Sequence, residues 1–125
     1  MDVRARRFDY VAAGHPGPVH VPSEGAPCPY PSTATPIGLL PGVDFEETSL
    51  TLAPGDRFYL YTDGLTEAAN RHDEELGQER LCETLEKFRG EPIGRTLQRL
   101  LERAHAWQGS EASNDDVSLL AAQIW

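Results

Sequence analysis

The run Phe58 to Tyr61 is the feature that most limits how this chain can fold. Its four side chains, Phe-Tyr-Leu-Tyr, are all large and apolar or aromatic. A strand with one face in water alternates apolar and polar residues, whereas a strand in the middle of a packed sheet does not need to. The run therefore predicts a central strand.

Shorter segments before this run predict two hairpins. The first joins residues 8–13 to a strand that resumes at Val19, through the turn "GHPGP". The second joins the alternating segment Phe45–Leu52 to the central strand, through the turn "APGD". Both turns are predicted from Gly and Pro, which favour reversals of the chain. Residues 22–36 hold too many prolines for a helix or a central strand, so we expect a loop there.

Two amphipathic helices are expected after the central strand. The first covers residues 77–88 and the second begins near Pro92, each with apolar residues at helical spacing on one side. We interpret both stripes as core faces. Residues 117–125 predict a last strand. The order of hairpin, hairpin, helix, helix and strand indicates an α+β fold, with helices packed on one face of antiparallel strands.

Size, charge and cysteine content limit the possible partners. A chain of 125 residues suits a single domain. Its net charge of −9 argues against binding to nucleic acid or to anionic lipid. No apolar run approaches the roughly 20 residues of a membrane span. Cys28 and Cys82 stand far apart, in no metal-ligand spacing, which favours reduced thiols in a cytoplasmic protein.

Asp63 is the first candidate for chemistry. It follows the central strand and precedes Gly64, whose missing side chain allows close approach of backbone or ligand. A carboxylate at a strand end is held firmly and faces outward, as a ligand-binding group would be. The alternative is structural: Asp63 or Thr62 would cap a short helix over residues 66–70, with Glu67 in its first turn. This stretch alone leaves both interpretations open.

The second candidate is "SNDDVS", residues 113–118, where Asp115 and Asp116 open the last strand. Adjacent carboxylates repel each other unless they are solvated or bound to a cation. If Asp115 lies beside Asp63, the two form half of an oxygen-ligand site suited to Mg²⁺ or Mn²⁺. Alternatively, the acidic pair merely ends a loop.

The third candidate is His15, which follows Gly14 in the first predicted turn. A histidine there would contact a phosphate or orient a ligand, or it would simply cap the hairpin. The sequence has no zinc pattern, phosphate-binding Walker loop, dinucleotide fingerprint or nucleophile elbow. Metal-assisted chemistry is therefore the principal enzymatic option. The other histidines show no metal-site spacing; they are His20, His72 and His105.

Four segments, in order, resemble one family over nearly the whole chain. They are "FDYVAAGHPGPV", "TPIGLL", "LTLAPGDRFYLYTDGLTEAANRHDEELGQERL" and "SNDDVSLLAAQI". Together they are similar to the C-terminal half of the metal-dependent protein serine/threonine phosphatases of the PPM type, in the bacterial SpoIIE/RsbU-like branch. The resemblance implies an antiparallel β-sandwich flanked by helices, with two Mn²⁺ or Mg²⁺ ions at one end. It also implies hydrolysis of phosphoserine or phosphothreonine by a metal-bridged water.

The resemblance assigns roles by position. Asp63 and Asp115 match two ligands of the same metal, whereas Asp116 and Gly64 would support them without ligating. Gly14 and His15 fall on a shared motif to which no chemical role is assigned. In the family, a bridging aspartate comes from the preceding half of the domain. We therefore expect residues 1–125 to be the C-terminal portion of one domain, and to bind Mn²⁺ weakly alone.

Three hypotheses for function follow. The leading one is a protein phosphatase that regulates a sigma-factor or stress pathway, acting on a phosphorylated protein of the anti-anti-sigma type. The runner-up is a non-catalytic module, derived from such a phosphatase, that binds a phosphoprotein or a regulator. The third is a plain acidic, cation-binding α+β domain.

Overall fold

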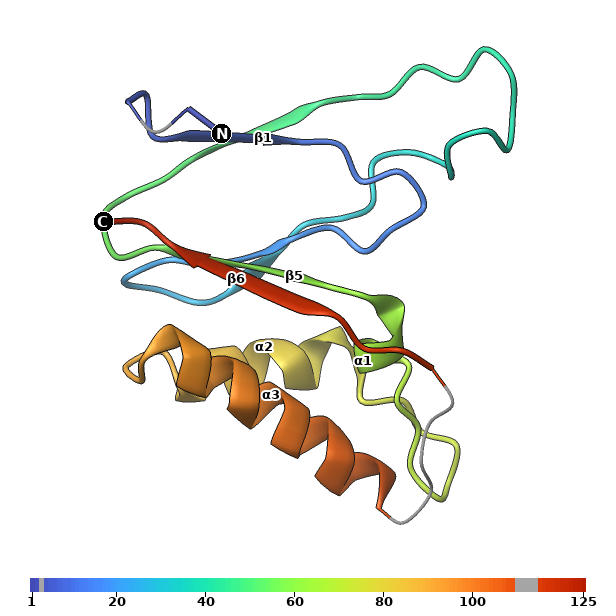
Figure 1. Cartoon of the computed structure of the whole chain (residues 1–125), viewed down its shortest axis with the longest axis vertical. Helices are drawn as coiled ribbons and strands as arrows, with labels where there is room; N and C mark the ends of the chain where they lie inside the picture. The colour runs from blue at the N-terminus through green and yellow to red at the C-terminus, as the bar shows by residue number, and fades with distance from the viewer. Residues whose placement is uncertain (3, 110–114) are drawn as a thin grey trace.

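The computed structural model describes residues 1–2, 4–109 and 115–125, and it arranges them in three layers (Figure 1). A two-stranded sheet lies on one side, a four-stranded sheet in the middle, and two helices on the other side. The first sheet pairs β1 (Arg7–Tyr10) with β4 (Thr48–Thr51). The second sheet has the order β3-β2-β5-β6. Its strands are β2 (Val19–Val21), β3 (Cys28–Pro29), β5 (Arg57–Tyr61) and β6 (Leu119–Gln123).

The central position expected for Phe58 to Tyr61 is confirmed. Strand β5 pairs with β2 on one edge and with β6 on the other, both antiparallel. All but one of its residues are buried. The side chains alternate between the two layers, as strand geometry requires. Tyr59 and Tyr61 join the core beneath the helices, while Phe58 joins the core between the two sheets.

Both predicted hairpins are wrong. Strand β1 pairs with β4, not with β2, and β4 and β5 lie in different sheets. Each turn leads the chain from one sheet to the other. The strands on either side of the turn pack face to face across the sandwich and do not pair edge to edge. The rings of Phe8 and Phe58 stack across that interface with centroids 4.8 Å apart. Turn residues thus mark a reversal of the chain but do not select the strand's partner.

The two long helices are confirmed close to their predicted bounds. They are α2 (Gly77–Lys87) and α3 (Ile93–Gln108), with Pro92 at the N-cap of α3. Both pack on the four-stranded sheet. Leu81, Leu85 and Leu100 of the predicted stripes are fully buried, whereas Leu101 is exposed. No helix in the described part of the chain is long and apolar enough to cross a membrane.

Three smaller predictions need adjustment. The short helix α1 spans Asp63–Thr66, earlier than the expected residues 66–70, and Glu67 is its C-cap. The proline-rich segment 22–36 is mostly loop but contributes the short strand β3. That strand lies at the edge of its sheet, where proline's missing donor is tolerated. The last strand is shorter than expected, because β6 covers only Leu119–Gln123.

Candidate metal centre

Asp63 lies where β5 turns into α1. It is the first residue of the helix, and its side chain is exposed. The carboxylate oxygen Oδ1 accepts a hydrogen bond from the backbone N–H of Gly64 at 3.0 Å, and the backbone carbonyl accepts from the N–H of Glu67 at 2.8 Å. The carboxylate therefore lies just beyond the end of a buried strand and faces solvent.

The pairing of β5 with β6 brings Asp115 to the same edge of the sheet. The end of one antiparallel strand lies beside the start of its neighbour, and the ladder ends with Tyr61 opposite Leu119. Gly64 makes the approach possible, because a Cβ there would lie 2.7 Å from the carbonyl oxygen of Asp116 and 3.5 Å from Cβ of Asp115. The glycine gives clearance to the protein's own backbone.

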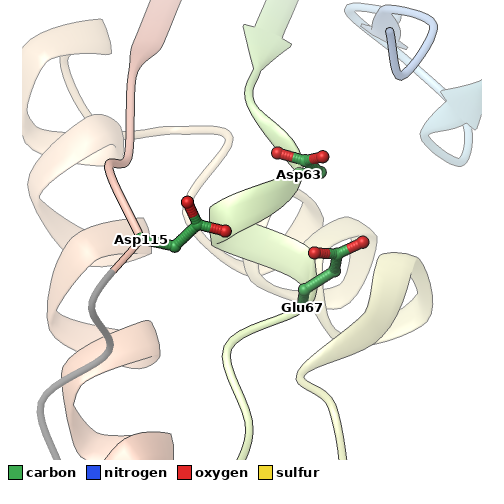
Figure 2. Close-up of side chains that lie close together, drawn as sticks. All are labelled: Asp63, Glu67 and Asp115. Carbon is green, nitrogen blue, oxygen red and sulfur yellow. The ribbon is translucent and has the colours of Figure 1, made fainter. Parts of the chain in front are cut away.

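Glu67 completes a group of three carboxylates (Figure 2). One carboxylate oxygen from each of Asp63, Glu67 and Asp115 lies within 4.8 Å of the others. Glu67 was predicted to lie in the first turn of a short helix, not to be a ligand. The spacing was a usable signal, because residues four apart share one face of a helical turn. Figure 2 shows Asp115 approaching α1 from the segment before β6.

The donor set fits a hard divalent cation. All three groups are exposed carboxylates, and oxygen donors are those that Mg²⁺ and Mn²⁺ prefer. In an octahedral site with bonds of about 2.1 Å, ligand oxygens stand roughly 3 to 4 Å apart. The three side chains therefore need only small rotations to reach ligand distance. Without a cation their negative charges repel one another, so binding relieves an electrostatic cost.

The remaining predicted site residues lie around this group or away from it. Asp116 is exposed, and its backbone carbonyl accepts a hydrogen bond from the hydroxyl of Thr62.

The motif of Gly14 and His15 is not part of the acidic group. Gly14 has a φ of +68°, and its N–H donates to the carbonyl oxygen of Ala34. His15 is exposed, with Nδ1 2.9 Å from the carbonyl oxygen of Pro16, and it is not in the acidic group. The first two residues of "SNDDVS" lie outside the described residues.

A second aspartate stands at the opposite end of β5. Asp56 precedes the strand and is buried, and its carboxylate accepts hydrogen bonds from the N–H groups of Ala53 and Ser23 at 2.9 Å. Nε2 of His20 lies 2.9 Å from the same carboxylate, and the His20 ring stacks on Phe58. Burial opposes ionisation, but the hydrogen bonds and His20 outweigh it and lower the pKa of Asp56. The sequence alone did not predict this pair.

Known proteins resemble the chain in sequence and in structure. The family model of Stage II sporulation protein E (SpoIIE) matches residues 1–125. Phosphoserine phosphatase RsbP of Bacillus subtilis is 35% identical over 65 residues, which are 52% of this chain and 16% of RsbP. The solved RsbU and RsbW domains of Rv1364c from Mycobacterium tuberculosis match with a TM-score of 0.82 and 33% identity, covering 98% of this chain and 34% of that one.

A third likeness concerns the fold alone. The SiaA-PP2C domain of Pseudomonas aeruginosa matches with a TM-score of 0.83 at 23% identity, over 96% of this chain and 47% of that chain. The chain thus spans less than half of each of these three proteins. The layered β-sandwich with flanking helices is the expected PPM-type fold. The chain belongs to the SpoIIE family and carries a PPM-type, SpoIIE/RsbU-like phosphatase domain sequence.

Proposed function

We propose that residues 1–125 are the C-terminal portion of a protein serine/threonine phosphatase domain in which Asp63, Glu67 and Asp115 bind Mn²⁺ or Mg²⁺. The observation that carries this proposal is the meeting of three exposed carboxylates at one end of the β-sandwich, in a chain of this family. A bound ion would lower the pKa of a water ligand and neutralise charge on the phosphoryl group. Asp63 follows β5 and Asp115 precedes β6, and these two strands pair with each other.

Charge makes the cation necessary for phosphate chemistry at this place. Three carboxylates without a metal would repel a phosphate dianion. The exposure of the group suits a phosphorylated side chain on the surface of another protein, which cannot enter a deep cavity. The proposed substrate is therefore a phosphoserine or phosphothreonine protein. The resemblance to the SpoIIE/RsbU-like branch favours one of the anti-anti-sigma type. The name of RsbP, a phosphoserine phosphatase, supports this substrate class.

A test uses the natural protein that contains this chain, with an aryl phosphate and a phosphoserine peptide as substrates in the presence of Mn²⁺. Asp63→Asn and Asp115→Asn should each lower the rate more than about a hundredfold, because each removes a metal ligand. Asp44→Asn is the control, since Asp44 is an exposed acid outside the acidic group. Undiminished activity in both ligand variants would refute the assignment.

The alternative is a non-catalytic module of the same family, which would bind a phosphoprotein or a regulator without hydrolysis. The described residues of such a module would still supply the three carboxylates of the candidate site. A binding module would hold the phosphoserine peptide without releasing phosphate, and Asp63→Asn would leave phosphate release at the background rate it already had. The same assay thus separates the two functions.

A further inference from the structure

Thr62 stands at the N-cap of α1 but does not act as a capping residue. Its backbone has the extended conformation of an N-cap, with φ −83° and ψ 155°. Threonine there normally accepts a hydrogen bond from an N–H of the first helical turn. The structure describes every residue of α1, and the Thr62 side chain accepts no hydrogen bond from the N–H groups of this helix. Its hydroxyl is used elsewhere.

That hydroxyl bridges two backbone groups on the segment that carries Asp115. Oγ1 of Thr62 donates to the carbonyl oxygen of Asp116 at 3.2 Å and accepts from the N–H of Ser118 at 2.9 Å. The N–H of Thr62 also donates to the carbonyl oxygen of Ser118 at 3.1 Å. Three hydrogen bonds from one residue thus fix a segment more than fifty positions away.

The hydroxyl takes the place of the backbone carbonyl of Thr62, which forms its hydrogen bond within α1. In a continued antiparallel ladder, Ser118 N–H would donate to the carbonyl of Thr62, one step beyond Tyr61 and Leu119. That carbonyl instead accepts from the N–H of Leu65 as α1 begins. The side chain of Thr62 therefore takes the place of its backbone and extends strand pairing to the edge of the acidic group.

Gly64 allows the same segment to lie close to α1. The carbonyl of Asp116 lies so close to Gly64 that any Cβ would meet it at 2.7 Å. The Asp116 carbonyl thus accepts a hydrogen bond from the Thr62 hydroxyl and lies close to the Gly64 backbone. Asp115 is the residue immediately before this fixed carbonyl, and its carboxylate belongs to the acidic group with Asp63 and Glu67.

We propose that Thr62 is a positioning residue that sets the placement of Asp115 relative to Asp63 for metal binding. This inference rests on the proposed function, because it needs the acidic group to bind a cation. Thr62 itself does not touch the ion. Its hydroxyl fixes the backbone of residues 116–118, and thereby the position from which the Asp115 carboxylate reaches the site.

The test measures Mn²⁺ affinity of this 125-residue chain by electron paramagnetic resonance of the free ion. Thr62→Val keeps the shape and β-branching of the side chain but removes the hydroxyl. It should weaken Mn²⁺ binding by about tenfold to a hundredfold, as loss of groups that orient metal ligands does. Thr62→Ser restores the hydroxyl and should bind Mn²⁺ as the wild type does. Thr51→Val is the matched control and should leave Mn²⁺ binding unchanged, because Thr51 is an exposed residue of β4, in the other sheet.

A second measurement detects the bridge itself, independently of any metal. Amide hydrogen exchange of Ser118 should be faster in Thr62→Val than in the wild type or in Thr62→Ser, with the same thermal unfolding midpoint in all three. If Thr62→Val exchanges like the wild type at Ser118, the hydroxyl does not hold the segment and the inference is wrong.

The outcomes separate this inference from the proposed function. If Asp63→Asn abolishes Mn²⁺ binding while Thr62→Val leaves it unchanged, the metal site stands and the positioning role of Thr62 is refuted. If Asp63→Asn and Asp115→Asn both bind Mn²⁺ like the wild type, the metal site is refuted, and the inference falls with it. Weaker binding in Thr62→Val with rescue by Thr62→Ser supports both.

Discussion

The two ends of β5 carry the same side chain in opposite environments. Asp56 at the start is 3% exposed and is surrounded by hydrogen-bond donors from Ala53, Ser23 and His20. Asp63 at the end is exposed and has Glu67 and Asp115 for neighbours. The first carboxylate is satisfied by the protein, whereas the second is gathered with like charges. The difference separates an aspartate that stabilises the fold from one that is available to a ligand.

The largest expected difference between the two aspartates is in stability. Asp56→Ala should lower the free energy of unfolding by about 3 kcal/mol, because it removes a buried carboxylate that accepts three partly buried hydrogen bonds, from Ala53, Ser23 and His20. Asp63→Ala should change it by no more than about 0.5 kcal/mol, as exposed substitutions usually do. Urea unfolding of both variants measures the two values. Equal losses would show that the ends of β5 do not differ in this way.

The next test changes the clearance beside Asp63. Gly64→Ala places a Cβ against the Asp116 carbonyl, so the segment with Asp115 must move away. We expect Mn²⁺ binding to weaken about tenfold, as when the support of a metal ligand is lost. Gly94→Ala is the control, because a Cβ on Gly94 in α3 meets nothing within 4 Å. Titration calorimetry compares the variants, and equal affinities would contradict the role assigned to Gly64.

Acid should lower the stability that Asp56 contributes to the fold, because the pKa of its carboxyl is lowered in the folded state. Because the carboxyl titrates lower in the folded state than in the unfolded chain, its ionised form stabilises the fold at pH values above about 3.9. This contribution is lost as the pH falls below that value toward the folded-state pKa. The stability advantage of the wild type over Asp56→Asn should therefore shrink between neutral pH and about pH 3. Denaturant unfolding at several pH values measures it, and a constant difference would contradict the assignment.

The sequence predicted elements and their order better than it predicted strand pairing. The unbroken apolar run Phe58 to Tyr61 identified the central strand, and the stripes of leucine identified α2 and α3. The predicted pairing partners of β1 and β4 were wrong, because Gly and Pro mark a turn without specifying which sheet the next strand joins. That choice depends on how Phe8 stacks on Phe58 across the sandwich.

The sequence predicted only part of the candidate site, because some of its contacts also depend on how distant strands meet. Asp63 and Asp115 were paired in advance, since both stand at strand ends and match one family pattern. Glu67 was missed as a possible ligand, although its spacing from Asp63 was informative. The pair of His20 and Asp56 joins residues 36 positions apart, and no local pattern reveals such a contact. The hydroxyl bridge from Thr62 to Ser118 depends likewise on where two strand ends meet.

The central claim is that a divalent cation binds at the end of β5 that carries Asp63. Substoichiometric Mn²⁺ added to the ¹⁵N-labelled chain tests it directly, because the paramagnetic ion broadens nearby amide signals. We predict that signals of Asp63, Gly64, Glu67 and Asp115 broaden first, while Asp56, roughly 20 Å away along the strand, keeps its signal. Binding should be weak, with a dissociation constant above about 1 μM for half a site. Broadening centred elsewhere, or submicromolar affinity, would contradict the account.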